Sequence, residues 1–237
     1  MAAASPIISL ISAGILVVGV LGANLGFLEP MQGFSAYAMG GLAGGIFSTV
    51  VALIGLFLTR GGSDPAGRQK ALIGLMIALA LPIAVLGPAA VVGGDAPPIN
   101  DITTDLADPP AFADASLVAD YRNRDMSYPA EFVPIVEENY ADLAPLRVAD
   151  LPMAAFVRAE LAAEGLGWEI VAKDGDAMAF YAKDVTGLFK FVDDVVVRVR
   201  PDGAGSKIDV RSKSRDGRGD FGANATRIRA LLSALDG

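Results

Sequence analysis

The chain has 237 residues, of which 53% are hydrophobic, and it carries a formal net charge of −8 at pH 7. It contains no histidine and no cysteine, so the usual residues of Ser-His and Cys-His nucleophile pairs, of zinc sites and of histidine- or thiolate-bound iron cofactors are missing. We therefore expect no cofactor and no disulfide. An acidic chain also lacks the basic surface that nucleic-acid binding requires, so no nucleic-acid partner is expected.

Charged residues are distributed unevenly along the chain. The first 94 residues contain only five charged side chains, at Glu29, Arg60, Asp64, Arg68 and Lys70. Residues 95–237 contain 16 Lys and Arg against 25 Asp and Glu, which gives nine net negative charges. This shift predicts three parts: an apolar anchor over residues 1–94, an extended Pro/Asp-rich linker and arm over residues 95–150, and a soluble domain over residues 151–237.

Three apolar runs without charge, residues 7–28, 34–58 and 71–93, are 22, 25 and 23 residues long. At 1.5 Å per residue, each is long enough to cross a hydrocarbon core about 30 Å thick. We predict three transmembrane helices in contact with membrane lipid. A cleaved signal peptide is the alternative for the first run, but no Lys or Arg precedes it, and it exceeds the roughly 7–15 residues of a signal-peptide core.

The loops between these runs predict the orientation of the chain. The first loop, residues 29–33, has no positive side chain, whereas the second, residues 60–70, has three. Because positively charged loops stay in the cytoplasm, the N-terminus should be cytoplasmic and the C-terminal domain should lie on the other side. The Ala-, Gly- and Val-rich composition is typical of a bacterium with a GC-rich genome, so we expect a multi-pass protein of the bacterial inner membrane with a periplasmic domain.

Glycines recur at helical spacing in the first two runs. Gly22 and Gly26 form a GxxxG pair, as do Gly40 and Gly44. Small residues at this spacing let helix backbones approach closely. Two interpretations stay open: packing among the three helices of this chain, or docking against another membrane protein. None of the runs contains an ionisable residue, so a proton or ion pathway through the anchor is not expected.

Acidic residues gather in the linker that follows. Asp101, Asp105 and Asp108 suggest an oxygen-ligand calcium site, but their spacing does not match an EF-hand loop. Acids of turns and helix caps explain the pattern better, so no metal site is predicted. The mixed segment YRNRDMSYPAEF at residues 121–132 is an arm that could lie on the folded domain or on lipid headgroups.

The soluble domain shows the element order α-β-β-β-β-α. Periodicity and turn residues predict the elements as follows: a helix over residues 151–164, strands over residues 168–173, 177–183, 191–200 and 208–215, and a final helix over residues 221–235. The final helix has a broad apolar face that includes Phe221, Ile228 and Leu231. We predict an α+β fold, an antiparallel sheet with helices on one face, behind the three transmembrane helices.

The last strand alternates charged and uncharged residues. Asp209, Arg211, Lys213 and Arg215 share one parity, so one face of the strand carries the charge. Arginines grip anions bidentately, and a glycine-rich loop that enters a helix offers backbone N–H donors. The candidate anion-binding residues are Arg211, Arg215, Arg218, Arg227 and Asn224. The alternative is an internal ion-pair network that only orders the loop, with acids at Asp193, Asp194 and Asp220.

Three separated blocks carry a resemblance to a known family. They are PPINDITTDLADPPAF, FVDDVVVRVRP and DVRSKSRDGRGDFGANATRIR, in that order along the chain. Together they resemble the domain-of-unknown-function 1499 family, over roughly residues 97–235. The resemblance implies an extracytoplasmic domain beside a membrane and carries no assigned activity.

The function expected from these features is binding without catalysis. We expect a membrane-anchored extracytoplasmic domain that binds a partner membrane protein as an assembly or accessory subunit. The alternative is the binding of an anionic lipid headgroup, or another anionic ligand, by the Arg-rich loop. A hydrolase with Ser212 or Ser214 as nucleophile is a weaker interpretation, because the chain offers no histidine base and no nucleophile elbow.

Overall fold

The structure is a computed structural model that describes residues 1–236. Its internal contacts divide the chain into two compact units. The first unit comprises Met1–Gly94 and Gly187–Lys190. The second comprises Asp95–Thr186 and Phe191–Gly237, of which Gly237 lies outside the described residues.

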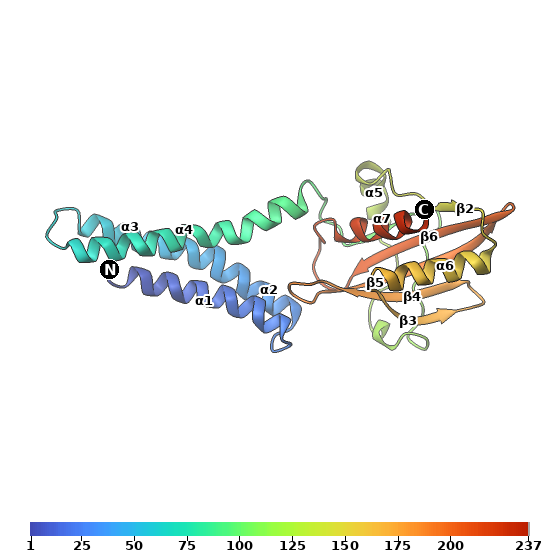
Figure 1. The fold of residues 1–237 in the computed structure, drawn as a ribbon, viewed down its shortest axis with the longest axis horizontal. Coiled ribbons are helices and arrows are strands. Elements are labelled where there is room, and N and C mark those ends of the chain that lie inside the picture. Colours follow the sequence, from blue (N-terminus) through green and yellow to red (C-terminus); the bar gives the residue numbers. More distant parts are fainter. Residues whose placement is uncertain (237) are drawn as a thin grey trace. The chain divides into compact units, whose positions relative to one another are not determined.

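The first unit is built from three long helical stretches (Figure 1). The first is α1 (Ser5–Asn24) and the third is α4 (Pro65–Gly93). In the second, α2 (Pro30–Ala38) continues through the π-helical turn η1 (Met39–Ala43) into α3 (Gly44–Leu58). All three stretches are long and apolar enough to cross a membrane, which confirms the three predicted apolar helices.

Polar caps and prolines set where these helices begin. At α4, the side chain of Asp64 accepts a hydrogen bond from the backbone N–H of Gly67 at 2.8 Å, and Pro65 follows in the first turn. At α2, Glu29 and Gln32 form a reciprocal capping box. These side chains satisfy backbone N–H groups that lack an intrahelical partner, so both helices start sharply after short loops.

Glycines bring the helices of the first unit close together. A methyl group added at Gly40 would lie 2.5 Å from the backbone nitrogen of Leu16, and one added at Gly44 would lie 2.7 Å from Oγ of Ser12. Both neighbours belong to α1, so the backbone of η1 and α3 lies directly against that helix. The spacing at Gly40 and Gly44 thus serves packing within the chain.

The other glycine pair has a different role from the one predicted. Gly26 follows the end of α1 with φ 76°, and nothing lies within 4 Å of a methyl group added there. The prediction that Gly26 packs helices is wrong, because the residue ends a helix in the left-handed conformation that glycine tolerates. A methyl group at Gly22 would meet the side chain of Leu28 at 2.7 Å, so Gly22 lies against the turn after α1.

The short segment Gly187–Lys190 packs within the first unit. The ring of Phe189 lies 5.5 Å from that of Phe34 and 5.2 Å from that of Tyr37 in edge-to-face contacts. Asn24 donates from Nδ2 to the carbonyl oxygen of Gly187 at 2.8 Å. The one amide side chain of α1 therefore satisfies a loop carbonyl.

The second unit is an antiparallel sheet of six strands in the order β1-β6-β5-β4-β3, in which β2 also pairs with β6. The strands are β1 (Asp101–Thr103), β2 (Leu146–Val148), β3 (Glu169–Asp174), β4 (Ala179–Val185), β5 (Val192–Asp202) and β6 (Gly205–Ser214). The helices are α5 (Val133–Asn139), α6 (Pro152–Gly165) and α7 (Ala223–Asp236), with 3-10 turns η2 (Ala119–Tyr121) and η3 (Ala130–Phe132). The predicted α+β class and antiparallel sheet are confirmed.

The segment expected to be a linker is part of this sheet. β1, β2 and α5 all lie within residues 95–150, and Val136 of α5 is buried in the core. The second unit therefore begins at Asp95, not at residue 151 as the sequence suggested. Strands of three residues show no periodicity of their own, so only their pairing with β6 reveals them.

The main core lies between the sheet and the helices α6 and α7, which cross one of its faces (Figure 1). Val195, Val197 and Ile208 point from the central strands toward Ile228 and Leu231 of α7. Phe221, predicted on this apolar face, lies outside it: α7 begins at Ala223, and the Phe221 side chain is exposed.

The opposite face of the sheet is covered by residues 104–130, called the arm below. Phe112 and Tyr121 of the arm form a second, smaller core with Tyr181 and Val196 of the sheet. The rings of Phe112 and Tyr121 meet edge to face at 5.4 Å. The segment 121–132, for which two positions were considered, packs on the folded domain through Tyr121 and Arg124.

Candidate functional site

Charged side chains line the sheet face beneath the arm. Alternate residues of β5 and β6 point to opposite faces, as the sequence alternation predicted. The side chains that point toward the arm are those of Asp194, Arg198, Arg200, Lys207, Asp209, Arg211, Lys213 and Arg215. These residues are the densest group of ionisable side chains in the second unit, so the candidate site is built from them.

Arg211 lies under the arm with 1% of its surface exposed. Its Nε and Nη2 donate to the two carboxylate oxygens of Asp101 at 2.9 and 2.8 Å. Its other hydrogen bonds reach the carbonyl oxygens of Pro110 at 3.3 Å, Met126 at 3.0 Å and Ser127 at 2.9 Å. One guanidinium therefore fastens β1 and two separate parts of the arm to β6.

Two aromatic rings enclose the same guanidinium. Its carbon lies 4.8 Å from the ring centre of Phe112 and 5.1 Å from that of Tyr128, within the range of cation–π contacts. Burial raises the pKa of Tyr128, and the nearby Asp101 carboxylate raises it further. The surroundings of Arg211 are thus a closed pocket of protein groups that leaves the guanidinium no approach for an external anion.

Asp194 forms a second set of ion pairs that connects the arm to the sheet. It accepts from Nη2 of Arg215 at 2.8 Å and from Nη1 of Arg124, an arm residue, at 2.6 Å. Arg215 also pairs with Asp120 of the arm at 3.0 Å. Burial alone would lower the pKa of Arg215, but its bonds to Asp194 and Asp120 outweigh burial and raise it.

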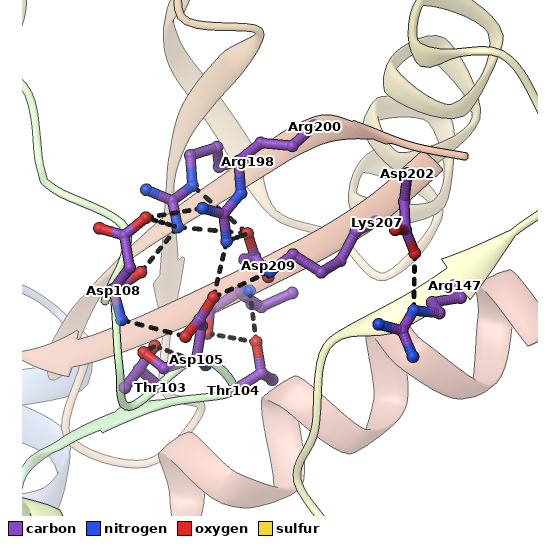
Figure 2. A network of polar contacts seen from close by, with 11 residues as sticks. Thr103, Thr104, Asp105, Asp108, Arg147, Arg198, Arg200, Asp202, Lys207 and Asp209 are labelled. Atoms are coloured by element: carbon purple, nitrogen blue, oxygen red, sulfur yellow. Dashed lines mark hydrogen bonds and ion pairs between the residues drawn. The ribbon is translucent and has the colours of Figure 1, made fainter. Parts of the chain in front are cut away.

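A third cluster surrounds the buried carboxylate of Asp209 (Figure 2). Its Oδ2 lies 2.6 Å from Arg200 and 3.2 Å from Arg198, while Oδ1 is 3.9 Å from Nζ of Lys207. Within residues 1–236, Oδ1 has no hydrogen-bond partner. Burial therefore outweighs the attraction of three positive neighbours and raises the pKa of Asp209.

Asp105 connects this cluster to the arm. Its carboxylate accepts from Nη2 of Arg200 at 2.6 Å and Nζ of Lys207 at 3.1 Å, and also from the backbone N–H of Asp108 at 3.0 Å. Burial alone would raise the pKa of Asp105, but these three hydrogen bonds together lower it. In Figure 2 the carboxylates of Asp105 and Asp108 point toward the basic side chains of β5 and β6.

The linker acids considered for calcium are partners of basic side chains. Asp101 faces Arg211 and Lys213, and Asp105 and Asp108 face Arg200. Among the residues that the structure describes, no group of three His, Cys, Asp or Glu is placed to hold a metal ion. These acidic residues form ion pairs with basic side chains of β5 and β6, and those ion pairs hold the arm against the sheet.

A buried polar cluster lies on the other face, under α7. Asn224 accepts hydrogen bonds from Oγ of Ser212 at 2.6 Å and from Arg227 at 2.8 Å, and donates to Oγ of Ser214 at 3.0 Å. Arg227 also bonds Asp193 at 2.6 Å. The two serines considered as nucleophiles are thus buried against an amide, which cannot act as a general base.

Comparison with protein families decides the affiliation of this domain. The model of the family described as "Protein of unknown function (DUF1499)" matches residues 101–235, more than half of the chain. The chain belongs to the DUF1499 family. A search of the curated proteins finds no matching relative.

The limits of the DUF1499 match follow the structure of the second unit. The match begins at Asp101, the first residue of β1 and the carboxylate partner of Arg211. It ends at Leu235, which is buried in the main core. The arm therefore lies inside the DUF1499 domain both by family match and by contacts, and the apolar helices precede it.

The structure separates the five residues predicted to bind an anion. Arg211 and Arg215 lie on the arm side of the DUF1499 sheet, whereas Arg227 and Asn224 lie under α7. All four are bonded to internal partners. Arg218 alone is exposed and has no ion pair or hydrogen bond within residues 1–236.

The three acidic residues predicted to form an internal ion-pair network, Asp193, Asp194 and Asp220, have different roles in the structure. Asp193 pairs with Arg227 at 2.6 Å, and Asp194 with Arg215 at 2.8 Å. Asp220, in contrast, is a helix cap whose carboxylate accepts the backbone N–H groups of Gly222 at 2.8 Å and Asn224 at 2.7 Å. Burial raises the pKa of Asp220 despite these bonds.

Sequence reasoning did not assign to this site its partners outside β5 and β6, which are Asp101 of β1 and Asp105, Asp108, Asp120 and Arg124 of the arm. The signal that could have found them is compositional: a run of acids at residues 101–108 precedes a run of bases at residues 198–215. Opposite charge in two segments permits pairing, but it does not specify which residues meet.

Proposed function

We propose that this protein is a non-enzymatic accessory subunit. In this proposal, three transmembrane helices hold the DUF1499 domain on the periplasmic side of a bacterial inner membrane, where it binds a partner membrane protein. The observation that carries the proposal is the outward face of α6, which presents large exposed apolar side chains.

The helix α6 is apolar on two sides. Its inward side is formed by Ala155, Phe156, Ala159 and Ala163, all buried in the core. Larger apolar side chains point outward along the helix and from the residue before it: Leu151, Met153, Val157 and Leu161, each between 46% and 68% exposed. A helix in a soluble domain normally buries its larger apolar residues, so this second face is typical of an interaction surface.

Charged residues flank this apolar row and are already paired. Arg158 bridges to Asp150 at 2.7 Å, and Lys173 bridges to Glu160. An apolar strip with a polar rim is the usual anatomy of a protein interface. The rim charges are neutralised locally, so a partner needs a complementary apolar helix or groove more than a complementary charge.

The length of the linker limits which partners the domain meets. Seven residues, 94–100, separate the end of α4 at Gly93 from β1, and they span at most about 25 Å when extended. A tether this short concentrates the domain near the membrane surface. Partners embedded in the same membrane are therefore favoured, and the loop charges at Arg60, Arg68 and Lys70 support the periplasmic side.

Site-specific photo-crosslinking in intact cells tests this proposal. A photoreactive amino acid at Leu161 should give one discrete adduct with another membrane protein, because that side chain faces away from the domain core. The matched control is Thr226, an exposed residue of α7, which should give no adduct. Val157→Glu should abolish the adduct while leaving domain stability within about 0.5 kcal/mol of wild type. An identical adduct at Thr226, or one that survives Val157→Glu, would refute the α6 interface.

A further inference from the structure

Two exposed side chains project from the loop between β6 and α7. Arg218 is exposed without a partner among residues 1–236, and Phe221 has 55% of its surface exposed. The neighbouring Arg215 is held by Asp194, so it is not available to the loop surface. The exposed guanidinium of Arg218 and the exposed ring of Phe221 are thus three positions apart in the sequence.

The backbone holds Phe221 outward at a conformational cost. Its φ is 54°, in the left-handed region that residues with a side chain rarely adopt. Such a conformation is unfavourable for a residue with a side chain and persists only where the surroundings enforce it. Here Asp220 accepts the N–H groups of Gly222 and Asn224, both of which follow Phe221. The Asp220 cap therefore fixes the backbone turn that carries the exposed Phe221 ring.

The rest of the loop is fixed to the segment that leads to the membrane helix. Asn100 donates from Nδ2 to the carbonyl oxygen of Gly217 at 2.8 Å. A methyl group added at Gly219 would lie 3.1 Å from Cα of Pro98, and one at Gly222 would lie 3.5 Å from Cβ of Ala96. The loop is thus packed along the first residues of the second unit.

This packing limits how far the loop can lie from the bilayer. The apolar span in α4 ends at Val91, and Ala96 follows it by five residues, which reach at most about 18 Å. Since Ala96 lies beside the loop, the covalent chain keeps Phe221 and Arg218 close to the end of the apolar span.

We propose that this loop is a membrane-interface anchor. Phe221 enters the boundary between headgroups and acyl chains, where aromatic rings concentrate. Arg218 donates to the phosphate oxygens of phospholipid headgroups, which its guanidinium matches in geometry. Asp95 and Asp216 are exposed acids in the same region, so the patch has no net positive charge. The ligand is accordingly the headgroup phosphate common to phospholipids, not the net charge of an anionic bilayer.

Fluorescence quenching in the full-length protein tests the anchor. Phe221→Trp in phosphatidylcholine vesicles should be quenched by lipids that carry a spin label near the headgroup. Trp168, the single native tryptophan, is buried in the core and gives the same background in every variant. The matched control is Leu161→Trp, an exposed apolar site on α6. Quenching of Phe221→Trp should exceed that of Leu161→Trp at least about twofold.

The same assay tests the role of Arg218. Arg218→Glu in the Phe221→Trp protein should reduce the quenching, and Arg218→Lys should preserve most of it. Equal quenching in phosphatidylcholine and phosphatidylglycerol vesicles is expected. Equal quenching of Phe221→Trp and Leu161→Trp would overturn the anchor, and quenching confined to phosphatidylglycerol would overturn the assignment to the headgroup phosphate. An unchanged Trp168 unfolding transition shows that each variant is folded.

Discussion

Arg211 keeps its charge in surroundings that exclude water. Transfer of a guanidinium into a protein interior is costly, and it is tolerated only when every donor finds an acceptor. Asp101 supplies two acceptors, and three backbone carbonyls of the arm supply the others. The result is a residue whose loss would release both β1 and the arm.

Arg211→Met should lower the free energy of unfolding by about 3 kcal/mol or more, because it leaves a buried carboxylate without its main partner. The matched control is Lys213→Met on the same strand. Lys213 also pairs with Asp101, at 3.1 Å, but Arg211 remains there, so we expect a loss of no more than about 2 kcal/mol. Urea unfolding of the detergent-solubilised protein, followed through Trp168 in the core, measures both. Equal losses would contradict the role given to Arg211.

Asp105→Asn should destabilise the protein at pH 7 but not at low pH. The folded state lowers the pKa of Asp105 below its ordinary value of 3.8. The ionised carboxylate therefore contributes stability above that value, and the contribution is lost as the pH falls through the lower, folded pKa. Wild type and variant should differ at pH 7 and converge as the pH falls below the folded pKa of Asp105.

The control for this pH dependence lies in the same view (Figure 2). Asp202 pairs with Arg147 at 2.6 Å, but both side chains are exposed, and an exposed pair contributes little. Asp202→Asn should leave the unfolding curve nearly unchanged at either pH. A difference between Asp105→Asn and wild type that persists undiminished at low pH would show that ionisation of Asp105 is not the cause.

Sequence periodicity predicted the charged face of β6 but not its partners. Parity alone places Arg211 and Arg215 on one face, because side chains alternate along a strand. The contact between Arg211 and Asp101 joins residues 110 positions apart, and no local pattern encodes it. Arg211 and Arg218 are chemically alike, yet one is enclosed and the other exposed, since only the first lies beneath the arm.

At the scale of single elements, the glycines of the apolar helices decide how closely the backbones approach. Gly40 lies in the π-helical turn η1, and Gly44 begins α3. Both face α1 at distances that a methyl group would violate. The spacing in the sequence identified the small residues, but internal packing and docking to another protein require the same pattern, so only the structure separates them.

Gly40→Ala should lower the free energy of unfolding of the first unit by about 1–3 kcal/mol, because the added methyl group would clash with the backbone of α1. The matched control is Gly87→Ala in α4, where nothing lies within 4 Å of the added methyl and alanine favours the helix. Thermal unfolding in detergent micelles, followed by circular dichroism, should show a loss only for Gly40→Ala. A loss of the same size for Gly87→Ala would argue against close packing at Gly40.

The helix α6 shows why amphipathic patterns can mislead. The predicted helix has apolar residues at Leu151, Ala154, Ala155, Val157 and Leu161, a period that indicates a face toward a core. In the structure only Ala155 of this set is buried, and it packs inward with Phe156, Ala159 and Ala163 while the other four are exposed. Small residues let α6 lie close to the sheet, and periodicity does not report that preference.

At the scale of the whole molecule, composition divides the chain correctly at its main boundary. The first compact unit ends at Gly94, where the apolar residues end. The second boundary, predicted at residue 150, does not exist in the structure, because the arm is polar and proline-rich yet folded onto the sheet. Its order comes from ion pairs and aromatic contacts with distant strands, which leave no periodic signal in the arm itself.

The proposed function places the DUF1499 domain outside the cytoplasm, and the lack of native cysteines makes this testable with single introduced thiols. Ser63→Cys probes the loop before α4, and Ser233→Cys probes the exposed side of α7. A membrane-impermeant maleimide applied to intact spheroplasts should label Ser233→Cys at once and Ser63→Cys only after lysis. Labelling of Ser63→Cys in intact spheroplasts, with Ser233→Cys protected until lysis, would place the domain in the cytoplasm and contradict the proposed function.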